Sequence, residues 1–205
     1  MARTNVMDRS LRLVESGNGR GGRPKLVEDG VLGMLLFIFV EIMVFAGMIS
    51  AYVIVEGAAL PGTWPPPDQP RLPWQETLLN TAALLVSGVV MVAAQRSLKA
   101  GRRDEARKRL GVAMALGAFF VAFQGFEWAG LIAEGLTMLS SQLGAFFYLI
   151  IGAHALHAVA ALIGLGWVHR AFARPEFRPH WLTTAALFWY FVVGMWPLLY
   201  WLVYL

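Results

Sequence analysis

The sequence predicts an all-α protein, an integral membrane bundle of five transmembrane helices with its N-terminus in the cytoplasm and its C-terminus outside. Two observations lead to this fold class. Five long apolar stretches fill most of the 205 residues, and the basic residues lie almost entirely on alternate connections between them. A helix needs about 20 apolar residues to cross a hydrocarbon core, and a backbone in lipid must satisfy its own hydrogen bonds. The expected spans are about 31–55, 77–95, 110–133, 142–168 and 181–204.

The composition supports a membrane protein and excludes several kinds of site. Hydrophobic residues make up 58% of the chain and charged residues 15%, which is more apolar surface than a water-soluble domain of this length buries. The sequence has no cysteine, so thiolate metal sites, disulfides and thiol nucleophiles are excluded. The formal net charge of +4 is explained by membrane orientation, and no nucleic-acid partner is expected.

The distribution of positive charge gives the orientation. All of the 17 Lys and Arg residues except Arg71 lie before the first span, in or beside the second connection, or in the fourth. The positive-inside rule places those segments in the cytoplasm. Residues 1–30 are expected to form a flexible polar cytoplasmic tail without a signal peptide, and residues 31–205 form one membrane domain. The Ala/Gly/Arg-rich tail favours the plasma (inner) membrane of a bacterium for this multi-pass chain.

The first span carries a carboxylate near its middle, at Glu41. An isolated charge there is strongly disfavoured, so we expect Glu41 to be protonated or bonded to neighbours inside the bundle. It is either a site for lipid, a proton or a partner subunit, or an interhelical hydrogen bond that fixes packing. Six prolines in the next connection, residues 56–75, exclude a regular helix. That connection is either a stiff connector or a loop that contacts a partner or covers a site.

The second span is followed by a charged turn, and the third span carries a polar cluster near its outer end. Gln124 and Glu127 are three residues apart and share one face of the helix. Trp128 follows directly and is placed to anchor the helix at the membrane interface. We interpret these three residues as a structural polar cluster that ties helix ends together.

The fourth span contains His154 and His157, whose spacing puts both on one face of a helix. Two histidines could ligate a metal or haem, but a haem held between two histidines in a membrane bundle takes them from different helices. No cysteine or carboxylate accompanies this pair. Interhelical hydrogen bonding is the favoured interpretation, no metal site is assigned, and a haem-b electron carrier stays as an alternative.

The fifth span ends in aromatic residues that are expected to form a belt at the outer membrane interface. They are Trp196, Tyr200, Trp201 and Tyr204. Nothing along the chain has the pattern of a nucleophile with its base, a phosphate-binding loop or a dinucleotide fingerprint. No catalytic residue is therefore assigned.

Four stretches, in order, resemble one family over residues 33–205: subunit III of haem-copper oxidases, the cytochrome c oxidase type, in its five-helix form. LGMLLFIFVEIMVFAGMISAYV resembles the family's first conserved helix, with Glu41 at its buried glutamate. WPPP and LPWQETLLNTAALLVSG resemble a Pro-rich entry and a polar pattern on the next helix. FFVAFQGFEWAGL resembles the helix with Gln, Glu and Trp, and GAFFYLIIGAHALHAVAALIGL resembles the helix with two histidines.

The last helix departs from the family pattern. The family has a WHFVD-like segment followed by a Trp, whereas here Tyr190 stands at the histidine and Val193 at the aspartate. Any role of those two polar groups is therefore not carried over. The chain then belongs either to a divergent oxidase branch or to a subunit III-like component of a nitric oxide reductase.

The resemblance implies a non-redox subunit of a respiratory haem-copper oxidase, with no active site of its own. Such a subunit packs on catalytic subunit I and the other oxidase subunits, holds phospholipids in a cleft, and supports proton uptake during aerobic electron transport. Haem and copper are expected in partner subunits and not in this chain. Glu41, His154 and His157 would then shape the bundle interior and the lipid cleft. Without the resemblance, a small membrane transporter that uses Glu41 as its ion site is the alternative.

Overall fold

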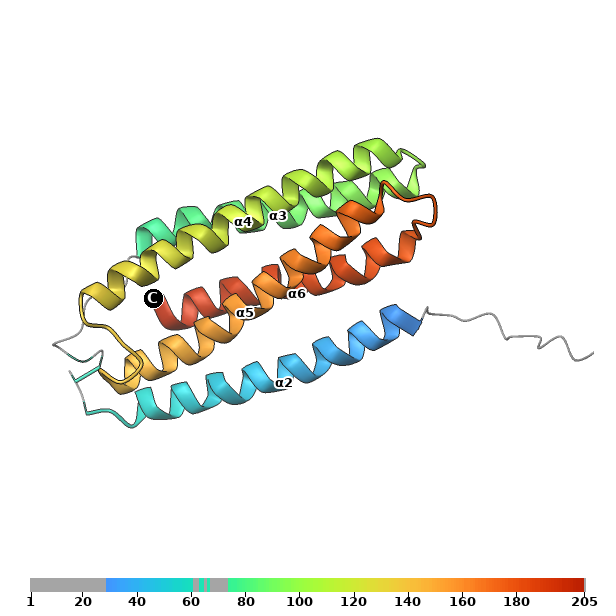
Figure 1. The fold of residues 1–205 in the computed structure, drawn as a ribbon. Coiled ribbons are helices and arrows are strands. Elements are labelled where there is room, and N and C mark those ends of the chain that lie inside the picture. Colours follow the sequence, from blue (N-terminus) through green and yellow to red (C-terminus); the bar gives the residue numbers. More distant parts are fainter. Residues whose placement is uncertain (1–28, 61–62, 65, 67–73, 205) are drawn as a thin grey trace, which may run out of the picture.

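The structure is a computed structural model that describes residues 29–60, 63, 64, 66 and 74–204. Its helices are α2 (Asp29–Gly57), α3 (Trp74–Lys99), α4 (Arg103–Ala133), α5 (Gln142–Ala171) and α6 (Pro179–Tyr204) (Figure 1). All five are long and apolar enough to cross a membrane, and the described part of the chain contains no strand. The predicted all-α bundle of five transmembrane helices is confirmed, while the orientation of its termini stays a prediction.

The helices extend beyond the predicted apolar spans, because charged residues continue them past the hydrocarbon. The largest difference is at α4, which begins at Arg103 rather than at residue 110. Arg109 near its start donates a hydrogen bond from Nη1 to Ser97 Oγ of α3, at 2.7 Å, and lies 3.4 Å from Glu105. The charged turn therefore also ties α3 to α4.

Two predicted segments fall mainly outside the described residues. Of the expected tail 1–30, only Asp29 and Gly30 are described, and they begin α2. Of the proline-rich connection 56–75, the described part includes Trp64, whose ring lies 5.9 Å from the ring of Tyr52. The flexibility of the tail and the stiffness of the connection stay predictions.

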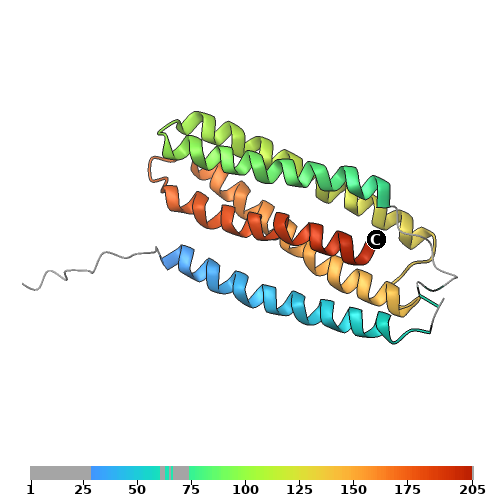
Figure 2. The same cartoon turned by 180° about the vertical axis from the view of Figure 1, so that it is seen from behind.

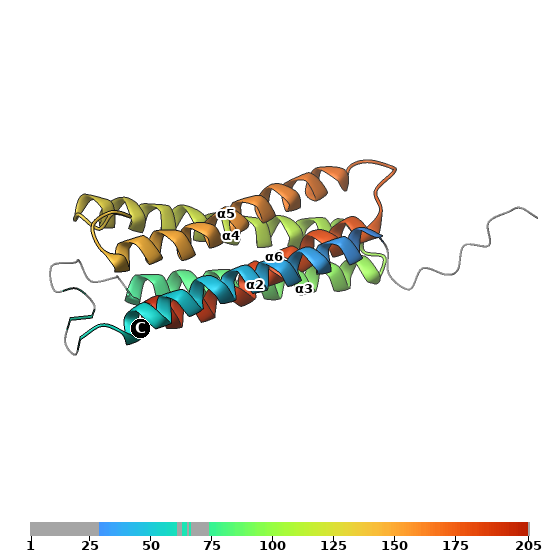
Figure 3. The same ribbon diagram turned by 90° about the horizontal axis from the view of Figure 1, so that it is seen from below.

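The helices form two layers (Figure 3). α4 and α5 lie in one layer, and α2, α6 and α3 lie side by side in the other. α6 is at the centre of its layer and contacts α2, α3 and α5. Among the described helices, α2 contacts only α5 and α6, so it is the peripheral helix of the bundle.

The helices alternate in direction, which places their connections at two opposite ends. The α3–α4 and α5–α6 connections lie at the end where α2 begins, while the α4–α5 connection and the C-terminus lie at the other end (Figures 1 and 2). Arg103 fastens the first of these ends. Its Nη2 donates to the carbonyl oxygens of Phe172 and Arg174, at 2.8 Å each, and its guanidinium lies 5.0 Å from the centre of the Phe177 ring.

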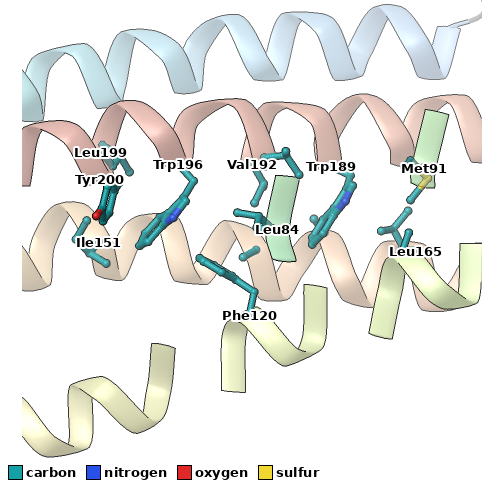
Figure 4. Close-up of a cluster of buried hydrophobic side chains, with 14 of the residues drawn as sticks. Leu84, Met91, Phe120, Ile151, Leu165, Trp189, Val192, Trp196, Leu199 and Tyr200 are labelled. Carbon is teal, nitrogen blue, oxygen red and sulfur yellow. The ribbon is translucent and has the colours of Figure 1, made fainter. Parts of the chain in front are cut away.

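The centre of the core is built from aromatic side chains of α6 that pack between the other helices (Figure 4). Trp189 and Trp196 are fully buried and lie two turns apart on one face of α6. Trp189 Nε1 donates to Ser87 Oγ at 3.2 Å, and Trp196 Nε1 donates to Thr81 Oγ1 at 2.8 Å. Both indole N–H groups thus find partners on α3, as a buried tryptophan requires.

The predicted aromatic belt at the end of α6 is wrong for three of its four residues. Trp196, Tyr200 and Tyr204 are buried, and only Trp201 is exposed, at 64%. The Tyr200 hydroxyl donates to the carbonyl oxygen of Trp74 at 2.8 Å. An aromatic residue near the end of a span meets lipid only if it points out of the bundle. The central position of α6 turns three of these four side chains inward.

Candidate functional site

Glu41 of α2 and His157 of α5 form the central polar contact of the peripheral helix. Glu41 Oε2 lies 3.1 Å from His157 Nε2, and the two side chains are 17% and 15% exposed. The other ring nitrogen, Nδ1, lies 2.6 Å from the carbonyl oxygen of Ala153. A carbonyl oxygen only accepts, so Nδ1 is the donor in that contact and Nε2 is the nitrogen that faces the Glu41 carboxyl. Glu41 thus links α2 to α5 through the ring of His157.

Aromatic rings surround this contact. The ring of His157 lies 5.6 Å from Phe45 and 6.5 Å from Phe37 on α2, and 6.0 Å from Phe188 and 6.2 Å from Phe191 on α6. Four phenylalanines from two helices thus give the pair a largely apolar surrounding. A hydrogen bond is electrostatically stronger in such a low-dielectric setting than in water.

His154 lies one turn before His157 but points into a different part of the bundle. Its side chain is 1% exposed, and its ring lies 5.1 Å from that of Trp196 on α6. Neither of its ring nitrogens has a hydrogen-bond partner among the described residues. In that same part of the chain, no three His, Cys, Asp or Glu side chains gather to hold a metal ion. The shared face of α5 therefore does not make one shared site.

Gln124 and Glu127 of α4 meet side chains of α3 and α6. Thr77 Oγ1 lies 3.1 Å from each carboxylate oxygen of Glu127. Gln124 Nε2 donates to Glu127 Oε2 at 2.9 Å and to the hydroxyl of Tyr204 at 3.0 Å. Trp128 is half-buried and turns toward the aromatic rings of α5 instead. The structure thus brings Gln124 and Glu127 together with the beginning of α3 and the end of α6, and places Trp128 beside them.

A groove of about 360 Å³ lies between α2, α5 and α6, at the end where α2 begins. Its wall is mainly apolar and includes Met34, Gly164 and Trp181. The inner end is closed by Phe188, which also contacts His157. The groove therefore runs from the basic end of the bundle to the edge of the Glu41–His157 contact.

Sequence reasoning missed several partners of these polar groups. Thr77 and Tyr204 complete the Glu127 cluster, yet they are 50 and 80 residues away from their partners along the chain. A signal existed for Thr77, which lies one turn before the polar Asn80–Thr81 pair on the same span. No local pattern marks Tyr204 as a core residue.

The two departures on α6 are accommodated by contacts with α3. The hydroxyl of Tyr190 donates to Gln95 Oε1 at 2.8 Å, so a polar link remains at the position of the family's histidine. Val193 packs against Gly88, where a Cβ would stand only 3.0 Å from Val193 Cγ1. An apolar side chain thus takes the place of the family's aspartate in a close helix–helix contact.

Comparison with known proteins gives a consistent result. Residues 6–205 match the family described as cytochrome c oxidase subunit III. The cytochrome c oxidase subunit 3 of Strongylocentrotus purpuratus is 31% identical over 209 residues, with 98% of this chain and 79% of the relative covered. The same subunit of Lumbricus terrestris is 32% identical over 94% of this chain and 76% of the relative. The same subunit of Ornithorhynchus anatinus is 32% identical over 92% of this chain and 74% of the relative.

Proposed function

The chain belongs to the cytochrome c oxidase subunit III family and is a transmembrane subunit of a haem-copper oxidase complex, and we propose that its role there is structural and regulatory. It holds no redox centre, packs on catalytic subunit I, binds phospholipid between its helices and supports proton uptake by the complex. The composition of its tail supports a bacterial plasma membrane as its location, although the three relatives named above come from animals.

The observation that carries the packing proposal is the exposed apolar surface of α2. Within an apolar stretch of 18 residues in each helix, only 6% of the stretch is buried in α2, against 33–44% in the other four helices. This surface includes the small residues Ala46, Gly47 and Ser50, and no described atom lies within 4 Å of a Cβ placed at Gly47. Small residues allow helices in membranes to approach closely. These features support a contact between α2 and a helix of the catalytic subunit.

The groove between α2, α5 and α6 supports the lipid part of the proposal. The mainly apolar wall of the groove suits an acyl chain. The basic α5–α6 connection lies at the end of the bundle where the groove opens and α2 begins (Figure 1). Arg174 and Arg178 of that connection are exposed. Arginine side chains next to a membrane attract anionic headgroups. The bound molecule would be a phospholipid with its headgroup at the basic end and a chain against Gly164 and Phe188.

Purification from the native membrane in mild detergent tests membership of the complex. A visible spectrum and mass spectrometry of the copurifying subunits should show haem that is assigned to a larger partner. Turnover of the complex with and without this subunit then tests the regulatory role, because loss of the subunit should slow proton uptake. A colourless preparation without partners would contradict both parts.

The lipid proposal has a matched pair of variants. Gly164→Leu places a large side chain in the groove, whereas Gly194→Leu adds the same group to an exposed position with no described atom within 4 Å of its Cβ. Lipid analysis of the purified complex should show less tightly bound phospholipid in Gly164→Leu only. Equal lipid content in both variants would contradict a lipid in this groove.

The alternatives make different predictions. A transporter that uses Glu41 as its ion site would show flux from the purified chain in vesicles, and Glu41→Gln would abolish it. A component of a nitric oxide reductase would copurify with a partner that reduces nitric oxide. A haem-b carrier would show a Soret band in the purified chain itself.

A further inference from the structure

A polar pocket of about 430 Å³ lies between the beginning of α4 and the end of α5. It is lined by four residues of α4 and one of α5, which are Asp104, Arg107, Lys108, Gly111 and His169. The spacing of the four α4 residues puts them on one face of that helix. The pocket shares no lining residue with the groove between α2, α5 and α6, so it is a separate site.

The pocket opens to the surface at one end of the bundle. This end also holds the α3–α4 and α5–α6 connections (Figure 1), and the charge distribution predicts it to be cytoplasmic. Asp104, Arg107 and Lys108 are exposed, so a ligand can reach them from outside. Arg107 and Lys108 come directly before the apolar span expected at 110–133. The pocket therefore lies at the level where lipid headgroups meet water.

The two basic residues of the pocket have no partner in the chain, unlike their neighbours on α4. Arg109 lies 3.4 Å from Glu105, and Arg103 donates to two carbonyl oxygens just past the end of α5. Arg107 and Lys108 make no hydrogen bond or ion pair with any described residue. Their N–H groups are therefore free for a ligand.

His169 adds a ring nitrogen to the same space. Its Nε2 lies 3.6 Å from the place where a Cβ of Gly111 would stand, so the ring reaches across from α5 to α4. Any residue larger than glycine there would fill the space in front of this nitrogen. The charges of Arg107 and Arg170 both act on the ring. Among the described residues that line the pocket, Asp104 is the only acidic one, which leaves two positive charges against one negative charge.

We propose that this pocket binds a phosphate-bearing anion, with Arg107 and Lys108 as its charged contacts and His169 as a further hydrogen-bond donor. Phosphate oxygens form strong charge-assisted hydrogen bonds with Arg and Lys. Basic pockets between transmembrane helices on the cytoplasmic side bind the headgroups of anionic lipids. A lipid phosphate is the source that the position beside the third span favours, and a soluble phosphate compound has the same chemistry. This inference does not depend on the proposed role in the oxidase.

A fluorescent label beside the pocket tests the lipid as the source of the phosphate. The chain has no cysteine, so a label at Ala115→Cys, an exposed position one turn from Gly111, reports on this place alone. In phosphatidylcholine vesicles, brominated phosphatidylglycerol should quench the label several-fold more than brominated phosphatidylcholine does. This selectivity should be lost in Arg107→Gln/Lys108→Gln.

Two matched controls separate the pocket from the basic surface as a whole. Arg96→Gln/Lys99→Gln removes the same charge from exposed positions of α3 that do not line the pocket, and it should keep the selectivity. Gly111→Leu closes the pocket without changing the charge and should abolish the selectivity. Gly130→Leu, on the same helix with no described atom within 4 Å of its Cβ, should not. Equal losses in the two charge variants would overturn the proposal.

Inorganic phosphate distinguishes the two sources. It is titrated into the full chain in an uncharged detergent without anionic lipid, and binding is followed by the line width in phosphorus NMR. Binding that is lost in Arg107→Gln/Lys108→Gln, without selective quenching in vesicles, would assign a soluble phosphate compound, whereas selective quenching assigns a lipid headgroup. The absence of both effects would overturn the proposal. So would a map of the complex that shows an acidic side chain of a neighbouring subunit in the pocket.

Discussion

α2 and the group α3–α6 differ in a way that runs against experience with water-soluble proteins. α2 is the most apolar of the five helices. Yet only 6% of its apolar 18-residue stretch is buried, against 44% of the corresponding stretch of α6. The helices with more polar residues form the core, where hydroxyl, amide and indole groups bond across α3, α4 and α6. Lipid is as apolar as leucine, so apolarity does not drive a helix into the bundle. Close packing and hydrogen bonds decide which helices are central.

The largest loss of stability should come from truncating a buried side chain in the core, whereas the same truncation on the exposed face of α2 should have little effect. Leu84 of α3 is fully buried, whereas Leu36 of α2 is 60% exposed. Leu84→Ala should lower the free energy of unfolding by about 2–5 kcal/mol through the cavity it leaves. Leu36→Ala should change it by less than about 0.5 kcal/mol. Thermal or denaturant unfolding of the full chain in detergent measures both, and equal losses would break the comparison.

A smaller loss of unfolding free energy should follow from adding one methyl group where α4 meets α6. A Cβ at Gly117 would stand closer to two ring carbons of Trp189 than contact allows, and 3.1 Å from Leu162. Overpacking a fitted core costs about 1–3 kcal/mol, so Gly117→Ala should be destabilising by that amount. Gly130→Ala on the same helix is the control, because no described atom lies within 4 Å of its Cβ. Unfolding of the two variants should differ clearly.

The bonds between α6 and α3 can be measured by a double-mutant cycle. Trp196→Phe and Thr81→Val each remove one partner of the 2.8 Å hydrogen bond. Such bonds in membrane bundles contribute about 0.6 kcal/mol on average and at most about 1.7 kcal/mol. We expect a favourable coupling energy in that range from unfolding of the wild type, both single variants and the double variant. Strict additivity would mean that packing alone holds α6 to α3.

The smallest global effect, but the clearest local one, should come from the contact that holds α2. Glu41→Leu leaves His157 Nε2 without its partner, so α2 should move away from α5 while global stability falls by about 1 kcal/mol or less. The chain has no cysteine, so spin labels at Gly47→Cys and Leu156→Cys report this distance without background. The distance distribution should broaden in Glu41→Leu and stay narrow in Glu41→Gln, whose amide still reaches the ring.

A second pair of labels provides the control for that experiment. Leu79 of α3 and Phe126 of α4 are both more than three-quarters exposed, and their helices do not contact α2 among the described residues. Labels at these two positions should keep the same distance in every Glu41 variant. A change there would mean that Glu41 supports the whole bundle rather than α2 alone.

Much of the fold could be predicted because hydropathy is a local property of the chain. Each span is recognisable from about 20 consecutive, mainly apolar residues, so the number of helices was predictable. The charged turn before the third span explains why α4 is longer than the apolar stretch. The candidate site was predictable only in part. The sequence singled out Glu41 and His157 as costly groups in need of partners, but nothing local showed that they would meet each other. His154 and His157 share a face by spacing, yet His154 lies against Trp196 of α6, whereas His157 meets Glu41 of α2.

By itself, the sequence determined five spans, the polar groups inside them and the family, because these depend on composition and on short patterns. Only the tertiary structure decided that α2 is peripheral, that Trp196, Tyr200 and Tyr204 turn inward, and that Thr77 and Tyr204 complete the Glu127 cluster. Such contacts join residues 50 to 126 positions apart. They follow from how five helices pack around one another, and no short stretch of the chain contains that information.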